Sequence, residues 1–272
     1  MKESKQSEKV LLLENVSKFF AEYQAVKKAN LFVGQSEIVG LVGESGCGKT
    51  TIAKIIAGLE QAEEGSLFIK DKEINLQVAR SKSQKKMIQL VFQNALGSFN
   101  PKFSLRSSLS QPIIEHGLVI SKEQIEEKLH SLLEAVHLEI DLLDRLPSQV
   151  SGGQIQRAAI ARALASEPDL LIADEPTSAL DVSIRAEVLR LFKELRIKQN
   201  ISCLVISHDL PSLKFLADRI YVMNKGEIVE EGNAKSVIES PQNEYTKKLI
   251  TAIPSLNPAD QTFMKWKKLQ EA

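Results

Sequence analysis

The chain has little cysteine, no net charge and no long apolar run, and each absence narrows its class. Only two of its 272 residues are cysteines, Cys47 and Cys203, so we expect neither a disulfide framework nor a metal cluster. The 35 basic residues balance 35 acidic ones, which argues against broad electrostatic capture of nucleic acid. No apolar run approaches the roughly 20 residues that span a bilayer, and the polar start MKESKQSEK lacks the apolar core of a secretory leader. We therefore expect a soluble protein of a reducing compartment.

What the chain does have is the composition of a folded domain, with 43% hydrophobic and 26% charged residues. Four short apolar runs predict buried strands: Ile38–Gly43, Ile88–Phe92, Leu170–Asp174 and Cys203–Ser207. Helical periodicity lies between them, at 121–138 and at 182–199. Capping residues precede these helices, Ser121 with Gln124 in the first case and Asp181 in the second. The alternation of strands and helices predicts a parallel sheet covered by helices.

Two regions depart from this pattern and predict antiparallel hairpins. Ser66–Ile74 and Tyr221–Glu230 each contain two short strands around a turn. Residues 94–166 lack convincing strands and predict a mostly helical insertion. The expected fold class is therefore α/β, with an antiparallel β part and an inserted helical part.

Two basic segments could be either binding surfaces or ordinary solvent-exposed segments. The run Lys82–Lys86 is more typical of a solvated loop than of a binding patch. A helix is expected at Glu244–Ile253, followed by Pro254, Pro258 and a basic tail. For the tail segment Phe263–Leu269 we favour a packed or frayed terminal helix over membrane-surface or partner docking.

A phosphate-binding motif stands between the first apolar run and a helical pattern at Thr50–Leu59. GESGCGKT at 43–50 matches G-x-x-x-x-G-K-[ST]. Its backbone N–H groups and the positive end of the helix would surround a phosphate. Lys49 would place a positive charge beside the outer phosphates, and Thr50 would offer its hydroxyl to Mg²⁺. The expected nucleotide-binding residues here are Gly43, Glu44, Ser45, Gly46, Cys47, Gly48, Lys49, Thr50 and Thr51. A ligand-free turn is the alternative, and Cys47 is either a small tolerated residue or a thiol activated by the helix end.

Polar side chains end two more of the predicted strands. Asp174 and Glu175 follow an apolar strand and would lie at the sheet edge where open α/β folds bind ligands. There Asp174 would hold Mg²⁺ and Glu175 would orient or deprotonate the attacking water. His208, after the strand Cys203–Ser207, could reach the γ-phosphate. The alternatives are a solvated strand end and a capping histidine.

Ser151 begins a helix that runs to Ala165 and stops before Pro168. Its hydroxyl can cap the helix, and Gly152 and Gly153 leave the first backbone N–H groups bare. This end predicts either a second anion site in the same chain or a plain helix cap.

The phosphate loop, the motif Ser151-Gly152-Gly153-Gln154 and the pair Asp174-Glu175, in this order, resemble the ATP-binding cassette (ABC) ATPase family over residues 8–240. The resemblance implies a P-loop NTPase core with an antiparallel β subdomain and a helical subdomain, about 94–166, inserted in the α/β core.

The resemblance also implies roles for individual residues. Phe20 occupies the position that stacks on adenine, with Tyr23 as a competitor, and Gln93 touches Mg²⁺ and senses the γ-phosphate. The signature residues are Ser151, Gly152, Gly153 and Gln154, and in the family they close over the nucleotide of a second cassette. His208 matches the switch histidine, and 178–181 matches the loop that communicates across the dimer. The catalytic set implied is Lys49, Gln93, Glu175 and His208, with ATP and Mg²⁺ as ligands.

Two further segments are similar to the oligopeptide, dipeptide and nickel importer branch. They are 98–101, SFNP, and 240–254, SPQNEYTKKLITAIP, so that 241–272 resembles the C-terminal extension of this branch. The branch implies a second ATPase subunit, two transmembrane permease subunits, an extracytoplasmic substrate-binding protein and a place at the cytoplasmic face of the membrane. It implies no nucleic-acid partner, and the lack of cysteine after Cys203 excludes an iron–sulfur cluster in the extension.

The sequence leaves several alternatives open. The second cassette could be a different chain or another copy, and the cargo could be a peptide, nickel or a metal chelate. The rival functions are a non-transport ABC ATPase of DNA repair or translation, an exporter subunit, a P-loop kinase or GTPase, and a non-catalytic docking module. Val150 and Asn94-Ala95 depart mildly from the family pattern, and the second departure bears on how the loop meets a membrane subunit.

Overall fold

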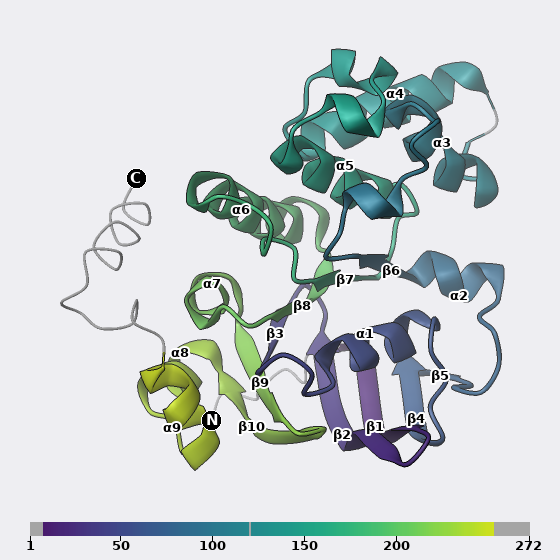
Figure 1. The fold of residues 1–272 in the computed structure, drawn as a ribbon. Coiled ribbons are helices and arrows are strands. Elements are labelled where there is room, and N and C mark those ends of the chain that lie inside the picture. Colours follow the sequence, from purple (N-terminus) through teal and green to yellow (C-terminus); the bar gives the residue numbers. More distant parts are fainter. Residues whose placement is uncertain (1–7, 120, 253–272) are drawn as a thin grey trace, which may run out of the picture.

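Two β-sheets and a group of helices form the part of the chain that the structure, a computed structural model, describes: residues 8–119 and 121–252 (Figure 1). The strands are β1 (Lys9–Phe20), β2 (Tyr23–Gly34), β3 (Ile38–Val42), β4 (Glu64–Ile69), β5 (Lys72–Ile74), β6 (Ile88–Val91), β7 (Leu170–Asp174), β8 (Ser202–Ser207), β9 (Arg219–Asn224) and β10 (Glu227–Asn233). The α-helices are α1 (Lys49–Ala57), α2 (Lys82–Met87), α3 (Leu105–Glu115), α4 (Lys122–Ala135), α5 (Gly152–Leu164), α6 (Val182–Gln199), α7 (Leu210–Leu216), α8 (Ala234–Glu239) and α9 (Glu244–Thr251). Short 3₁₀ helices are η1 (Leu96–Ser98), η2 (Ile140–Asp144) and η3 (Pro147–Gln149).

The larger sheet has the strand order β10-β9-β3-β8-β7-β6. Strands β3, β8, β7 and β6 are parallel, which confirms the four predicted buried strands and their arrangement. Alternate residues of β3 enter two different cores, since Ile38 and Val42 face one and Val39 and Leu41 face the other. A strand covered on both faces needs no polar alternation, and this explains its continuous apolar sequence.

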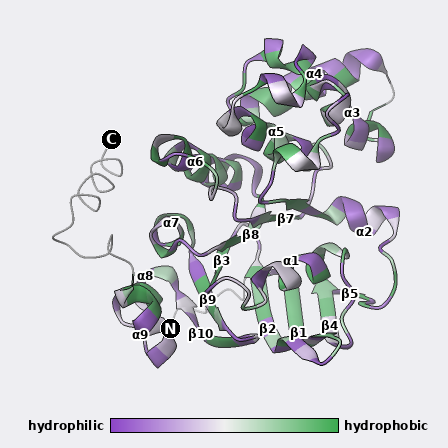
Figure 2. Ribbon diagram, in the orientation of Figure 1, coloured by the Kyte–Doolittle hydropathy of each residue, from purple (hydrophilic) through white to green (hydrophobic). Residues whose placement is uncertain are grey.

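The smaller sheet is antiparallel, with the order β2-β1-β4-β5. It packs with α1 against one face of the larger sheet, and Figure 2 shows the hydrophobic colour concentrated on these strands. The hairpins predicted at Ser66–Ile74 and Tyr221–Glu230 are confirmed as β4–β5 and β9–β10. The long strands β1 and β2 were not predicted individually, because register shifts interrupt their pairing and mix polar residues into both faces.

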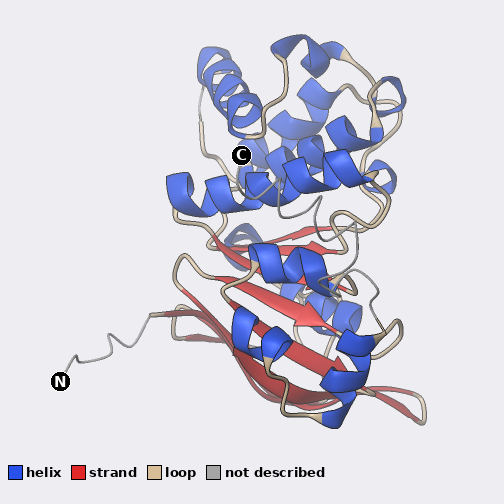
Figure 3. Ribbon diagram, turned by 90° about the vertical axis from the view of Figure 1, so that its left-hand side faces the viewer, coloured by secondary structure: helices blue, strands red, loops and turns tan. Residues whose placement is uncertain are grey.

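Helices occupy the stretch between β6 and β7, as predicted for 94–166. Figure 1 labels α3, α4 and α5 at one end of the molecule, and Figure 3 shows this end as helical and away from most of the strands. They pack with α6 and α7 on the other face of the larger sheet. This arrangement is the P-loop NTPase core with an antiparallel β part and an inserted helical part that the sequence predicted.

Local boundaries differ from expectation at several places, and helix α4, for example, ends at Ala135 and not at residue 138. The basic run Lys82–Lys86 is not a loop: it lies in α2, because Ser81 and Gln84 form a capping box that starts a helix. Helix α1 ends at Ala57 and not at Leu59, because Gly58 adopts a left-handed conformation that closes it. Helix α9 ends at Thr251, and Pro254, Pro258 and the segment Phe263–Leu269 lie outside the described residues.

Within 8–119 and 121–252 no helix is both long and apolar enough to cross a bilayer.

Candidate functional site

The loop between β3 and α1 folds around the ammonium group of Lys49. This lysine is the first residue of α1, and its side chain turns back across the loop that precedes it. Its Nζ donates to the carbonyl oxygens of Gly43 and Glu44, both at 2.8 Å. Because Lys49 is only 6% exposed, a full positive charge is held at the centre of the loop, beside the positive end of α1.

Glycine is required at both ends of this loop by close packing. A Cβ at Gly43 would collide with the carbonyl oxygen of Met223, and one at Gly48 would collide with that of Ala25. Gly48 also has a φ of +112°, which side-chain-bearing residues rarely adopt. At Gly46, in contrast, a Cβ would meet nothing within 4 Å, so the middle of the loop opens onto free space. A loop packed at its ends and open in its middle fits a phosphate there.

Cys47 is a buried packing residue within this loop. Burial raises the pKa of its thiol, and that effect outweighs the nearby charge of Lys49. Burial and the raised pKa argue against the alternative of a thiol activated by the helix end. The carbonyl oxygen of Cys47 accepts a hydrogen bond from the N–H of Gly226 at 2.9 Å, so the turn between β9 and β10 supports the loop.

Asp174 lies at the end of β7 with its carboxylate turned towards the phosphate loop. It is 6% exposed, and its Oδ1 has no hydrogen-bonding partner. Burial raises the pKa of this carboxyl, while the nearby Thr50 hydroxyl and Lys49 ammonium oppose the rise. A buried, unpartnered carboxylate oxygen close to a hydroxyl fits a Mg²⁺ site, because Mg²⁺ takes oxygen ligands. The described residues contain no cluster of three or more His, Cys, Asp and Glu side chains, so phosphate and water oxygens would complete such a site.

Glu175 and His208 come together as a hydrogen-bonded pair. They follow the neighbouring strands β7 and β8, and Glu175 Oε1 lies 2.8 Å from His208 Nδ1. Glu175 has a left-handed φ of +51°, and its N–H donates to the carbonyl oxygen of Ile206 at 2.9 Å. The glutamate side chain is 13% exposed and the histidine 58%. A shielded carboxylate is thus held by a histidine that faces solvent.

Gln93, after β6, contacts the loop that follows β7. Its Nε2 donates to Ser178 Oγ at 3.3 Å, and Ser178 Oγ donates to the carbonyl oxygen of Glu175 at 3.1 Å. The same side chains line a cavity of about 550 Å³ that Gly152 also borders. The structure therefore brings Gln93, the loop at 178–181 and the start of α5 to one hollow.

The start of α5 is a capped and partly open helix end. Ser151 Oγ accepts from the N–H of Gln154 at 3.3 Å, and Gln154 Oε1 accepts from the N–H of Ser151 at 2.9 Å. A Cβ at Gly152 would meet only Leu180, at 3.8 Å, whereas one at Gly153 would lie 2.6 Å from Ile184. The two glycines thus differ: Gly153 is needed for packing against α6, and Gly152 faces open space.

The predicted adenine-stacking residues lie at the turn between β1 and β2. Phe20 is 45% exposed and Tyr23 is 58% exposed. The ammonium of Lys18 lies 5.0 Å from the centre of the Phe20 ring. Both rings are available at the tip of a hairpin whose second strand touches the phosphate loop at Ala25.

One contact with the phosphate loop was missed by sequence reasoning. The N–H of Glu44 donates to the hydroxyl of Tyr245 in α9, at 3.2 Å. In the sequence, the segment around Tyr245 indicates only a resemblance to an importer branch. Its place beside a loop about two hundred positions earlier has no local signal in the sequence.

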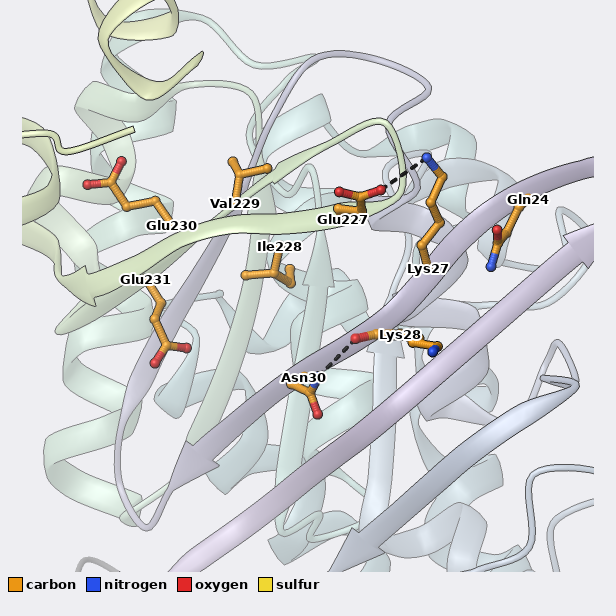
Figure 4. Close-up of a pocket in the computed structure, with 9 residues that line it drawn as sticks. All are labelled: Gln24, Lys27, Lys28, Asn30, Glu227, Ile228, Val229, Glu230 and Glu231. Atoms are coloured by element: carbon orange, nitrogen blue, oxygen red, sulfur yellow. Dashed lines mark hydrogen bonds and ion pairs between the residues drawn. The ribbon is translucent and has the colours of Figure 1, made fainter. Parts of the chain in front are cut away.

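A second hollow, of about 690 Å³, lies between β2 and β10 (Figure 4). Lys27 and Glu227 face each other across it in an ion pair of 3.2 Å. Glu230 lies further along β10. None of the predicted site residues lines this hollow.

Comparisons with known proteins show what the chain is similar to. The sequence profile of the family described as ABC transporter matches residues 26–178. The chain is similar to the oligopeptide transport ATP-binding protein OppF of Lactococcus lactis subsp. lactis (strain IL1403), with 41% identity over 234 residues, 86% of this chain and 73% of that protein. It is 38% identical to the oligopeptide transport ATP-binding protein AmiF of Streptococcus pneumoniae serotype 4 (strain ATCC BAA-334 / TIGR4) over 258 residues, 93% of this chain and 84% of that protein. A solved dimeric structure of the ATP-binding cassette MJ0796 with ADP and Pi superposes with a TM-score of 0.73 and 30% identity, covering 82% of this chain and 98% of that one.

Proposed function

This chain belongs to the ABC transporter family, and from that premise we propose that it is the ATP-hydrolysing subunit of an oligopeptide importer. The observation that carries the proposal is the meeting, at one sheet edge, of the Lys49 loop, the Asp174 carboxylate with its unpartnered Oδ1, and the Glu175–His208 pair. ATP binding and hydrolysis follow from this arrangement and from the family. The oligopeptide cargo is proposed from the names of OppF and AmiF.

Each residue of the site has a proposed task in ATP hydrolysis. Lys49 and the loop amides bind the phosphates, and Phe20, or Tyr23 in its place, stacks on adenine. Thr50, Asp174 and Gln93 would hold Mg²⁺, which neutralises phosphate charge when bound.

The hydrogen-bonded pair is proposed to handle the attacking water. Glu175 orients the water, and His208 fixes the Glu175 carboxylate while its exposed face meets the γ-phosphate. The shielding of Glu175 supports this task, because a carboxylate with one firm partner keeps one orientation.

A second cassette is proposed to complete the site. Ser151, Gly152, Gly153 and Gln154 of one chain would close over ATP bound to the loop of the other. The open space at Gly152 supports this, since an anion can approach the bare amides there. ATP favours the closed pair only by binding it more tightly than the open one, so hydrolysis lets the pair open.

The same proposal covers the remaining partners and the domain limits. Two transmembrane permease subunits would receive the closing motion through the segment 93–105, fed by an extracytoplasmic substrate-binding protein. The chain would then lie at the cytoplasmic face of the membrane and bind no nucleic acid. We assign residues 8–240 to the cassette, with 94–166 as its helical subdomain, and 241–272 to a C-terminal extension.

The test is Glu175→Gln in the complete transporter. The variant should keep its ATP affinity and lose most hydrolysis, about 100-fold or more, because placing the water is a large part of the reaction. Phosphate release and ATP binding are measured side by side. The matched control is Glu187→Gln, which alters a surface glutamate of α6 paired with Arg157 and should leave turnover unchanged. Turnover near normal in Glu175→Gln would refute the assigned role.

Lys49→Ala tests the phosphate loop itself. Removing the buried ammonium should weaken ATP binding, because the outer phosphates lose their fixed charge partner. Calorimetric titration of the purified chain with MgATP measures the change. Unchanged affinity would overturn the nucleotide site and the proposed function with it.

A further inference from the structure

Helix α9 reaches the phosphate loop through a single side chain. The Tyr245 hydroxyl accepts a hydrogen bond from the N–H of Glu44 at 3.2 Å. The carbonyl oxygen of the same Glu44 accepts from Lys49 Nζ at 2.8 Å. Glu44 is thus held on one side by the C-terminal part of the chain and on the other by the ATP-binding lysine.

The start of α9 is fixed to β10 by a carboxylate clamp. Glu230 Oε1 accepts from the N–H of Gln242 at 2.7 Å, and Oε2 accepts from the N–H of Asn243 at 3.1 Å. Asn243 in turn donates from Nδ2 to the carbonyl oxygen of Val229 at 3.2 Å, and its Oδ1 caps α9 by accepting from the N–H of Tyr245 at 2.9 Å. Burial alone would raise the pKa of Glu230, but these amide hydrogen bonds, together with the Thr246 hydroxyl and the charge of Lys247, outweigh it and lower the pKa overall. The clamp therefore stays charged at neutral pH and determines where Tyr245 stands.

The Tyr245 ring gives the contact a rigid base. It packs against the larger hydrophobic core together with Leu249 and Ile250 of the same helix. Burial raises the pKa of its hydroxyl, so the group remains a neutral phenol. A side chain with a packed ring and one hydroxyl on a loop amide orients that amide with little freedom to move.

We propose that Tyr245 is a positioning residue for ATP binding: it fixes Glu44, and through Glu44 the loop around Lys49, in the shape that receives phosphate. This rests on the proposed nucleotide site and adds a control of it by the C-terminal helix. A loop ordered before binding loses less conformational entropy when ATP arrives, so the contact strengthens binding. It does not touch the reacting atoms, and so it acts on affinity and not on the chemical step.

The test is Tyr245→Phe in the full chain, which removes the hydroxyl and keeps the packed ring. Calorimetric titration with MgATP should show a dissociation constant roughly three- to tenfold higher, the loss expected for one neutral hydrogen bond. In the assembled transporter, KM for ATP should rise by a similar factor while kcat stays unchanged. A general loss of structure would not produce this split between KM and kcat.

Tyr221→Phe is the matched control. It removes a different tyrosine hydroxyl, one that accepts from the N–H of Phe32 at 3.1 Å and contacts Arg219, outside the phosphate loop. It should lower the melting temperature and leave ATP affinity unchanged. An equal loss of affinity in both variants would mean a general effect of lost hydroxyls and would overturn the inference.

Glu230→Gln tests the clamp that places Tyr245. The amide keeps one neutral acceptor oxygen and turns an NH₂ group, which cannot accept, towards the other backbone N–H, so one hydrogen bond is weakened and one is lost. ATP affinity should then fall in the same direction as in Tyr245→Phe. The double variant should lose no more than the stronger single variant, because both act through one contact. If Lys49→Ala loses ATP binding while Tyr245→Phe does not, this inference fails and the nucleotide site stands. If neither loses binding, the proposed function fails.

Discussion

Asp174 shows how one residue can lower stability for the sake of chemistry. Its carboxylate is buried with an oxygen that no donor satisfies, and burial raises its pKa. A buried charge without full hydrogen bonding is costly in the folded state. The cost makes sense only if a cation that is bound during function supplies the missing partner.

Asp174→Asn should therefore stabilise the ligand-free chain and remove ATPase activity. Because the folded pKa of this carboxyl is raised, the cost of its charge is fully present above the folded pKa and vanishes below the unfolded value of about 3.9. The variant should melt a few degrees higher at pH 7 to 8, and the difference should shrink as the pH approaches 4. Thermal melts in a pH series, without nucleotide, measure this.

The control is Asp169→Asn, which changes a carboxylate just before β7 that pairs with Lys70. Asp169 has a partner, so its replacement should not raise the melting temperature. A lower melting temperature for Asp174→Asn at neutral pH would contradict the view that burial of this carboxylate destabilises the folded chain.

At the scale of elements, the sequence predicted what repeats locally and missed what depends on distant partners. The strands β3, β7 and β8 were predictable because burial on both faces leaves a mostly apolar run, and the shorter edge strand β6 keeps three apolar residues of four. Strands β1 and β2 were not, because their bulged pairing blurs the alternation of polar and apolar residues. Helix α2 was not predicted, because its run of lysines is also typical of a solvated loop, although its capping box is present in the sequence.

The candidate site follows the same division. The phosphate loop and the acidic strand end are contiguous motifs, so their residues were predictable, and the structure then brings Glu175 within 2.8 Å of His208. Tyr245 contacts Glu44 only because β10 and its clamp carry α9 back to the loop. A contact made by folding across the whole chain leaves no spacing pattern to read.

Arg162 links helix α5 to the segment after Gln93, two elements that lie far apart in the sequence. Its guanidinium donates to Ser98 at both the carbonyl oxygen and the hydroxyl, at 2.6 and 2.9 Å, and stacks 4.3 Å from the centre of the Phe99 ring. Arg162→Met should destabilise the fold by about 1–3 kcal/mol, because the Ser98 carbonyl loses a charged donor. Urea unfolding measures the change. Ser98→Ala keeps the carbonyl and should cost less; an equal or larger loss there would contradict the assignment.

At the scale of the whole molecule, the chain carries two helix N-termini that can bind phosphate, one at α1 and one at α5. In our proposal they bind different nucleotides. The loop around Lys49 is packed at its ends and open at Gly46, and the start of α5 is open at Gly152. One chain supplies one of each. If each binds the nucleotide of a different composite site, damage to the second end should spare ATP binding by the chain itself.

Gly152→Asp is the variant that separates the two ends. A Cβ there meets only Leu180 at 3.8 Å, so the chain should fold normally, while the new carboxylate would repel a phosphate at the helix start. We expect an unchanged melting temperature and an unchanged MgATP affinity of the isolated chain. In the assembled transporter we expect at least a tenfold loss of hydrolysis, because a rise of about 1.4 kcal/mol in the activation free energy lowers the rate tenfold. Calorimetry and phosphate release together measure both properties.

Two alanine variants show whether the loss comes from charge and not from the missing glycine. Gly152→Ala should retain most of the hydrolysis, because it adds a methyl group in open space. Gly153→Ala should lower the melting temperature, because its Cβ would lie 2.6 Å from Ile184 and force α5 away from α6. If Gly152→Asp instead abolished ATP binding by the isolated chain, the start of α5 would serve the chain's own nucleotide. A second cassette would then not be needed to complete the site.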